Sequence, residues 1–425
     1  MNILLDFRPF LNEIPSNGQY FCEDFCHALF RNNSSDVFYI WTTGGEHLPA
    51  QYKFDQYSNV RRIHTNIEID RLYTLIRFFG YPAIDDLVET LAMKNGHMAW
   101  VGKFDVAFFA TPMPVLLEGD CLHVQITNHL KPLHTPDIFL EDHMKYQEKK
   151  WYKKNWSNAD INVVPSEFLA NELRKEIDED DNPIFLSNVG ITQNIIRFVP
   201  NEDVNIKEEE IDDIIEMNDL YNERSYQQKK YDELPTHFFY SKETLETIEN
   251  TLKAFSLFRG RYSHSIVELI IEEPFKDAFK FTNFLSRNNY IKIIPPVLSN
   301  DKIIILSKCI AFIQPDIYNT EGISLLEAMK CGAPIICSSF GVFPEICPPS
   351  NYFFDPMSYN ELFRGMKHMY NLHKFHIEEE DNSEYNILSQ ENIKIASENK
   401  YSWDDITLNL MRNIQDILEE KEFGM

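Results

Sequence analysis

Positive charge, paired cysteines and long apolar runs are all scarce in this sequence of 425 residues. Its 40 lysines and arginines are outnumbered by 66 aspartates and glutamates, which gives a formal net charge of −26. Such an acidic chain is not expected to bind nucleic acid or to adhere nonspecifically to an anionic bilayer. No apolar run approaches the roughly 18 residues that a membrane span needs, and the N-terminal MNILLDFRPF lacks the pattern of a signal peptide. We therefore expect no transmembrane segment and a cytoplasmic protein.

The seven cysteines include no C-x-x-C pair. This usage is typical of buried or free thiols in a reducing compartment. No cluster of histidine and cysteine demands a bound metal, so we expect none.

What the sequence does contain is apolar material in short runs. Hydrophobic residues make up 44% of the chain and aromatic residues 13%, which indicates well-filled globular domains, and the length favours two of them. Short apolar runs alternate with helical patterns, and this alternation predicts an α/β fold with two doubly wound, Rossmann-like parallel sheets. The strands expected in the first half are 2–5, 37–41, 106–109, 122–127, 161–164 and 184–186, and those in the second half are 238–240, 266–271, 291–294, 311–313, 334–337 and 352–354.

An acidic segment separates the two halves. Residues 201–235 are rich in Asp and Glu and almost free of strand formers, so we interpret them as an insertion or linker between an N-terminal domain (1–200) and a C-terminal domain (236–400). The segment is either an exposed helix or partly disordered, with a solvated charged face as the default reading. A protein partner bound through this insertion is the functional alternative.

The most informative segment is 311–347, AFIQPDIYNTEGISLLEAMKCGAPIICSSFGVFPEIC. It predicts a buried strand, a loop, a helix from about Gly322 to Cys331, and a second buried strand. At 100° per residue Glu327 falls on the mostly apolar stripe of that helix, where a carboxylate is costly unless it is bonded. Either Glu327 reaches solvent or pairs with Lys330, or it contacts a ligand at the helix start, where phosphate-bearing ligands bind in open α/β sheets.

This segment resembles the retaining GT-B glycosyltransferases of family 4, which use nucleotide-sugar donors. The resemblance implies two Rossmann-like domains facing a central cleft, with the first on the acceptor side, the second binding the donor, and a C-terminal helix (402–420) packed back onto the first. The positions that match the family pattern are Pro315, Gly322, Glu327, Ala328, Met329, Gly332, Pro334, Ile335, Ile336, Pro344 and Glu345.

The resemblance continues through most of the chain outside the acidic insertion. Gly18 stands in the place of the family's glycine-rich loop, and residues 129–142 are similar to its histidine-containing stretch. A gapless match places Asn128 at the family's histidine, whereas a slip of one residue restores His129 to that place. Ser166 stands in the serine position of a later segment. The resemblance implies that Asn128 and Ser166 lie on the acceptor side, that Gly18 belongs to the donor-binding residues, and that His129 of the same domain is either catalytic or structural.

For the donor site, the resemblance implies that Glu327 binds the ribose hydroxyls. The N–H groups of Gly322, Ile323 and Ser324 would then meet the phosphates. The family's first signature glutamate, eight positions before Glu327, is replaced by Asn319, and Glu321 is the nearest acid. Sugar selection therefore falls to one of these two residues.

The family's pair of cations that neutralises the diphosphate is incomplete here. Lys242 stands for the arginine, but Leu245, Glu246, Thr247 and Ile248 fill the region of the lysine. The sequence thus leaves two hypotheses. One is a metal-independent retaining enzyme that moves a sugar from a nucleoside-diphosphate sugar, with UDP or GDP as the expected nucleotide, to a carbohydrate, lipid-linked or protein acceptor, using His129, Lys242 and Asn319 or Glu321. The other is a catalytically weakened subunit that binds an acceptor or regulates another glycosyltransferase.

Overall fold

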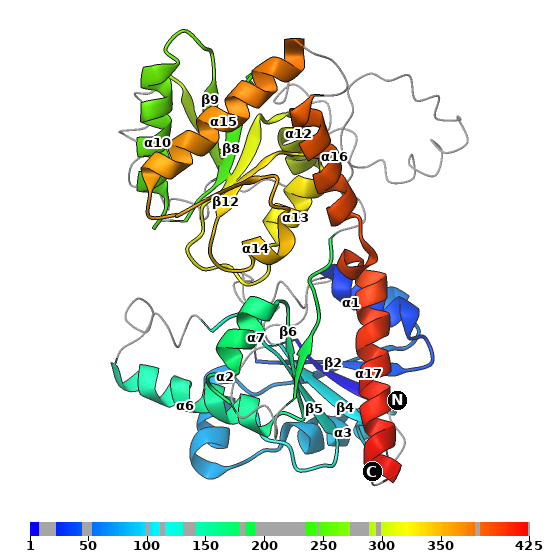
Figure 1. Cartoon of the computed structure of the whole chain (residues 1–425). Coiled ribbons are helices and arrows are strands. Elements are labelled where there is room, and N and C mark those ends of the chain that lie inside the picture. Colours follow the sequence, from blue (N-terminus) through cyan, green and yellow to red (C-terminus); the bar gives the residue numbers. More distant parts are fainter. Residues whose placement is uncertain are drawn as a thin grey trace, which may run out of the picture. The chain divides into compact units, whose positions relative to one another are not determined.

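A computed structural model describes residues 1–7, 23–44, 53–97, 102–110, 115–130, 142–177, 183–191, 235–244, 246–272, 289–294, 299–378 and 383–423. The chain divides into two compact α/β units (Figure 1). Unit 1 comprises 1–192, 319–323 and 398–425, and unit 2 comprises 193–318 and 324–397.

Unit 1 is built on a parallel sheet of seven strands in the order β3-β2-β1-β4-β5-β6-β7. Every pair of neighbours in it is parallel, so both faces must be covered by helices. The strands are β1 (Asn2–Asp6), β2 (Val37–Thr43), β3 (Val60–Thr65), β4 (Val106–Phe109), β5 (Leu122–Ile126), β6 (Ile161–Val164) and β7 (Ile184–Leu186).

The two faces of this sheet carry separate cores. Ile3 and Leu5 point into one core, while Leu4 between them points into the other, as the period of two in a strand requires. The helices of unit 1 are α1 (Glu23–Asn32), η3 (Phe54–Gln56), α2 (Ile69–Thr74), η4 (Leu75–Phe79), α3 (Ile84–Lys94), α6 (Asp142–Asn158), α7 (Glu167–Leu173), η6 (Asn399–Tyr401) and α17 (Trp403–Phe423).

Helix α17, at the C-terminal end of the sequence, packs beside α1 on the N-terminal sheet (Figure 1). Its Trp403 lies in the core with Phe25 of α1, and the two rings meet edge to face at 5.6 Å. Farther along, Lys421 forms an ion pair of 2.5 Å with Asp160, just before β6. Apolar contact and surface ion pairs thus hold α17 on unit 1.

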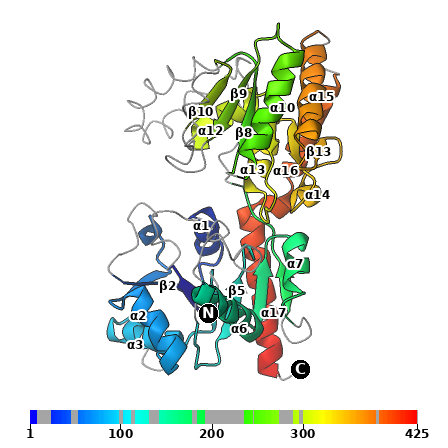
Figure 2. The same ribbon diagram turned by 90° about the vertical axis from the view of Figure 1, so that its left-hand side faces the viewer.

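Unit 2 contains a parallel sheet of six strands in the order β10-β9-β8-β11-β12-β13. Helices α10 and α15 lie side by side over one face (Figure 2), where they cover Phe239, Leu269 and Ile313. Tyr240 and Phe312 point to the opposite face, and their ring centroids are 5.6 Å apart. The strands are β8 (Phe238–Lys242), β9 (Glu268–Glu272), β10 (Ile291–Ile294), β11 (Ala311–Gln314), β12 (Ile335–Ser338) and β13 (Tyr352–Phe354). The helices are α10 (Ile248–Arg261), α12 (Ser299–Lys308), α13 (Ile323–Lys330), α14 (Phe343–Ile346), α15 (Tyr359–Glu378) and α16 (Glu384–Ala396).

The α/β class and the two parallel sheets expected from the sequence are confirmed. The list of expected strands was incomplete, because it omitted β3. This strand, VRRIHT, lies at the edge of its sheet with only three of its six residues buried, so it lacks the apolar run of a strand covered on both faces. Among the described residues no helix is both long and apolar enough to cross a bilayer.

Candidate functional site

In the sheet of unit 2 the strand order reverses between β8 and β11. The chain runs from β8 outward through β9 to β10, then returns to place β11 on the other side of β8. In open α/β sheets the crevice outside the carboxyl ends of two such strands is the usual binding place. Lys242 is the last residue of β8, and Gln314 is the last residue of β11. The candidate site is built around these two strand ends.

Lys242 reaches from its strand end to the first turn of α13. Its Nζ donates a hydrogen bond of 2.8 Å to Oγ of Ser324. Burial lowers the pKa of Lys242, and the nearby ammonium of Lys302 lowers it further, whereas the carboxylates of Glu272, Glu327 and Asp316 act in the opposite direction. The ammonium therefore lies in a crowded ionic environment rather than in open solvent.

Glu327 lies one turn farther along α13, and its carboxylate has a cationic partner. Its Oε2 accepts a hydrogen bond from Nζ of Lys302 on α12, in an ion pair whose side chains are only 14% and 13% exposed. The suggested pairing with Lys330 is absent, since Lys330 donates instead to Oγ of Ser397 at 2.6 Å. An ion pair with Lys302 therefore explains how a carboxylate is tolerated at this position, and among the described residues no hydrogen bond engages Oε1.

Three further acids line the same edge of the sheet. Glu272, at the end of β9, accepts a hydrogen bond from the hydroxyl of Tyr240, and Asp316 accepts one of 2.8 Å from Nε2 of Gln314. Glu243 is fully buried and accepts hydrogen bonds from Ser241 and from Thr247 (2.7 Å). Burial raises the pKa of Glu243 to about 7. The strand ends thus carry a network of charges whose members are hydrogen-bonded.

The loop before α13 is held by its own asparagine. Oδ1 of Asn319 accepts the N–H of Glu321 at 3.2 Å and that of Gly322 at 2.9 Å. Gly322 has φ +70°, a conformation that glycine adopts without strain. In this structure the N–H of Gly322, which was expected to meet a phosphate, donates to Asn319, and its contact with a phosphate stays a prediction. Asn319 thus orders the loop through an Asx-type turn.

The same loop belongs by its contacts to unit 1, where it lies with the predicted acceptor-side residues. Oγ of Ser166 donates to the carbonyl of Thr320 at 2.8 Å, and Oγ1 of Thr320 donates to the carbonyl of Asn128. Ser166 is also the N-cap of α7, since its Oγ accepts the N–H of Leu169. His129 follows Asn128 directly and is half-buried. Ile323 packs against the apolar core of unit 1.

The predicted residues therefore fall into two groups. Lys242, Ser324 and Glu327 lie in unit 2, where Lys242 bonds Ser324 and Lys302 pairs with Glu327, and the others that the structure describes lie in unit 1. Gly18 and the acidic segment 201–234 lie outside the described residues. Sequence reasoning missed Lys302. Its position 60 residues after Lys242, on a helix that precedes the signature segment, gives no local signal of a contact with Glu327.

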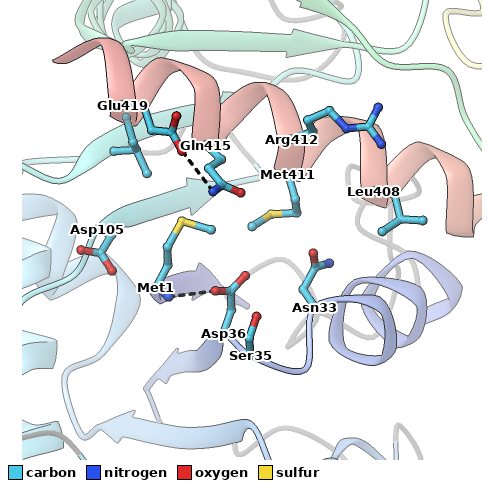
Figure 3. Close-up of a pocket in the computed structure, with 11 residues that line it drawn as sticks. Met1, Asn33, Ser35, Asp36, Asp105, Leu408, Met411, Arg412, Gln415 and Glu419 are labelled. Carbon is cyan, nitrogen blue, oxygen red and sulfur yellow. Dashed lines mark hydrogen bonds and ion pairs between the residues drawn. The ribbon is translucent and has the colours of Figure 1, made fainter. Parts of the chain in front are cut away.

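A separate pocket of about 610 Å³ lies in unit 1 between α17 and the amino ends of β1, β2 and β4 (Figure 3). The N-terminal ammonium of Met1 forms an ion pair with Asp36 there at 2.8 Å, and Arg412 of α17 also lines the pocket. Ligands of doubly wound sheets bind at the carboxyl ends of the strands. This pocket lies at the amino ends of the unit 1 strands and is not the candidate site.

Comparison with known proteins finds a family match over part of the chain. Residues 222–386 match the family described as glycosyl transferases group 1. This range includes Lys242, Lys302, Ser324 and Glu327. Among curated proteins, the O-antigen chain mannosyltransferase B of Escherichia coli is 30% identical over 71 residues, which are 17% of this chain and 19% of that protein.

Solved structures resemble the whole chain at low sequence identity. Sucrose-phosphate synthase from Thermosynechococcus elongatus superimposes with a TM-score of 0.64 at 12% identity and covers 99% of both chains. WaaG, a glycosyltransferase involved in lipopolysaccharide biosynthesis, gives 0.59 at 11% identity over 95% of this chain and 98% of its own. Anabaena HepE in complex with UDP-glucose gives 0.58 at 12% identity over 98% and 100%. These likenesses show that the fold is the GT-B fold.

Proposed function

We propose that this protein is a retaining glycosyltransferase that moves a sugar from a nucleoside-diphosphate sugar to a carbohydrate, lipid-linked or protein acceptor. In this proposal unit 2 binds the donor, and Asn128, His129 and Ser166 of unit 1 belong to the acceptor side. The proposed reaction requires no bound metal and takes place in the cytoplasm. The nucleotide of the donor is UDP or GDP.

The observation that carries the proposal is that the ammonium of Lys242 contacts the first turn of α13, the helix that also carries Glu327. Both side chains lie at the carboxyl edge of the sheet, at its switch point, and both fall inside the region that matches glycosyl transferases group 1. A cation and a carboxylate in this arrangement suit a ligand that carries phosphates and ribose hydroxyls. HepE, a protein of the same fold, has UDP-glucose bound in its crystal structure, which supports a nucleotide sugar as donor here.

Each residue then has a physical task. The carboxylate of Glu327 accepts hydrogen bonds from the ribose, and Lys242 stabilises the negative charge that develops on the departing diphosphate. Retention requires the acceptor oxygen to approach on the face from which the diphosphate leaves, so most of the catalytic effect comes from positioning and electrostatics. Asn319 or Glu321 would select the sugar.

The test is a panel of UDP-, GDP- and ADP-sugars, measured first by thermal shift and then by release of nucleoside diphosphate with and without glycan acceptors. A donor that binds raises the melting temperature in proportion to RT ln(1 + [L]/Kd). We expect stabilisation and turnover by at least one donor. The anomeric configuration of the product, read by NMR, tests retention.

Glu327→Ala is expected to abolish turnover while the protein stays folded. Lys330→Ala is the matched control, because Lys330 lies on the same helix and bonds only Ser397 among the described residues. Loss of activity in both variants would point to damage of α13 instead of loss of a ligand contact. A panel in which no donor binds would contradict the enzyme and favour the weakened, acceptor-binding subunit.

A further inference from the structure

We propose that Lys302, on helix α12, is the second cation of the donor site and neutralises the diphosphate of the nucleotide sugar together with Lys242. The inference rests on the proposed function and adds a residue to it. The residues that directly follow Lys242 in the sequence include no basic side chain, and Glu246, Thr247 and Ile248 occupy the positions where one was expected. A different element of the fold supplies the missing charge.

The geometry brings the two lysines to one place on α13. Lys242 donates to Ser324, and Lys302 donates to Glu327, three residues farther along the same helix. Residues three apart on a helix are neighbours on its surface. The two ammonium groups therefore flank the first turns of α13 at the carboxyl edge of the sheet, and they are close enough for Lys302 to disfavour the charge on Lys242.

Both ammonium groups retain capacity to bind an anion. A lysine ammonium has three N–H donors, and Lys242 and Lys302 each use one of them in the hydrogen bonds above. The remaining donors can contact phosphate oxygens without breaking the ion pair to Glu327. Glu327 meanwhile keeps Oε1 for the ribose, so one ligand can satisfy all three side chains.

The electrostatics also favour a multivalent anion at this position. Burial is the main cause of the lowered pKa of Lys242, and repulsion from the ammonium of Lys302 lowers it further. The carboxylates nearby have their own donors, with Tyr240 on Glu272 and Gln314 on Asp316. A diphosphate that bridges the two lysines would remove the repulsion between them.

The competing role for Lys302 is that of an anchor that only holds Glu327 in place. The two roles differ in their dependence on phosphate. An anchor affects the ribose contact and therefore every nucleoside ligand equally. A diphosphate-binding lysine affects ligands according to the number of their phosphates.

The experiment is calorimetric titration of the full chain and its Lys302→Met variant with uridine, UMP and UDP, and with guanosine, GMP and GDP. We expect Lys302→Met to weaken diphosphate binding by about tenfold or more, the loss expected for one charge-assisted contact, and to change nucleoside binding by less than about twofold. Lys302→Arg should retain most of the affinity. Lys308→Met, on the exposed side of the same helix, is the control and should behave as the wild type.

Equal losses for nucleoside and diphosphate, or no loss for either, would overturn the assignment. A wild-type chain that binds neither ligand series would instead overturn the proposed function itself. If Lys302→Met does not fold, because it leaves the carboxylate of Glu327 without its partner, the double variant Lys302→Gln with Glu327→Gln is compared with Glu327→Gln alone. A further loss confined to the diphosphates is then the expected result, and equal affinities of the two variants would refute the proposal.

Discussion

Gly190 packs against the indole of Trp403, 213 residues later in the sequence. A β-carbon on Gly190 would be 2.3 Å from Cδ2 and 2.6 Å from Cγ of that ring. The neighbouring backbone is joined as well, since the N–H of Ile191 donates to the carbonyl of Tyr401 at 2.9 Å. The start of α17 is therefore seated on unit 1 through a contact that only glycine permits.

Gly190→Ala should accordingly destabilise unit 1. The added methyl group must displace a buried ring, and such overpacking typically costs about 1–3 kcal/mol. Thermal unfolding followed by circular dichroism measures the effect. Gly260→Ala is the matched control, because Gly260 lies in α10 with nothing near its β-carbon position; there we expect unchanged or slightly higher stability. Equal melting temperatures for the two variants would show that the Trp403 contact is not restrictive.

Lys242→Met should reduce kcat/KM for the nucleotide sugar by about 10²–10³-fold, the usual effect of removing one group that stabilises developing charge. The hydrogen bond to Ser324 is lost with it, but the apolar stem is kept. Initial rates of nucleoside diphosphate release provide the measurement. Lys253→Met is the control, because Lys253 pairs with Glu249 on the surface of α10. Unchanged activity of the Lys242 variant would remove this residue from the mechanism.

Glu243 should make the protein less stable as pH rises between about 4.5 and 7. Burial raises its pKa in the folded state from 4.5 to about 7. The folded protein therefore holds a proton in this window that the unfolded chain has released, and the resulting loss of stability is about 3 kcal/mol. Above pH 7 this contribution is constant.

Glu243→Gln should flatten that dependence and be more stable than the wild type at pH 8. Denaturant unfolding from pH 5 to pH 8 measures it. Glu246→Gln, three residues away and exposed, is the control. Parallel stability curves for wild type and Glu243→Gln would show that Glu243 does not titrate in this range.

His123 should contribute the opposite trend at acid pH. It is 5% exposed, and burial lowers its pKa to about 4, against the raising effect of Asp160. The unfolded chain takes up a proton below about pH 6.5 that the folded protein accepts only near pH 4. Stability due to this group is therefore complete above about pH 6.5 and decreases by about 3 kcal/mol as pH falls to 4.

His123→Gln removes this dependence, and the difference in unfolding free energy between variant and wild type across pH 4–7 isolates it. His264→Gln is the control, because His264 is exposed. A difference that does not vary with pH would contradict the assignment to His123.

The local sequence pattern was sufficient to predict a strand where the strand is covered on both faces. The runs at β4 and β12 are apolar throughout most of their length, because residues on both sides of the sheet meet helices. The same reasoning failed at β3, where two arginines and a histidine occupy the less buried positions of an edge strand. Edge strands have a mixed polar and apolar pattern, so a search for short apolar runs does not find them.

The residues of the candidate site also differ in whether the sequence alone reveals them. Glu327 was found from the sequence because a carboxylate on an apolar helical stripe is anomalous within one element. Lys302 was not found, because its significance depends on α12 and α13 being neighbours in space. The role of Asn319 was also hidden, since an asparagine in a loop can face a ligand or bond the backbone, and only the fold shows that it holds Gly322.

Composition and periodicity were therefore enough to establish the α/β class, the two parallel sheets and the position of the anomalous glutamate, because each of these is encoded by residues close together in the chain. The partner of that glutamate, the seating of Trp403 on Gly190 and the pairing of Ser166 with Thr320 depended on the tertiary structure. These contacts join residues 25 to 213 positions apart. Parallel strands require crossover connections, so the residues that meet at a strand end come from distant parts of the sequence.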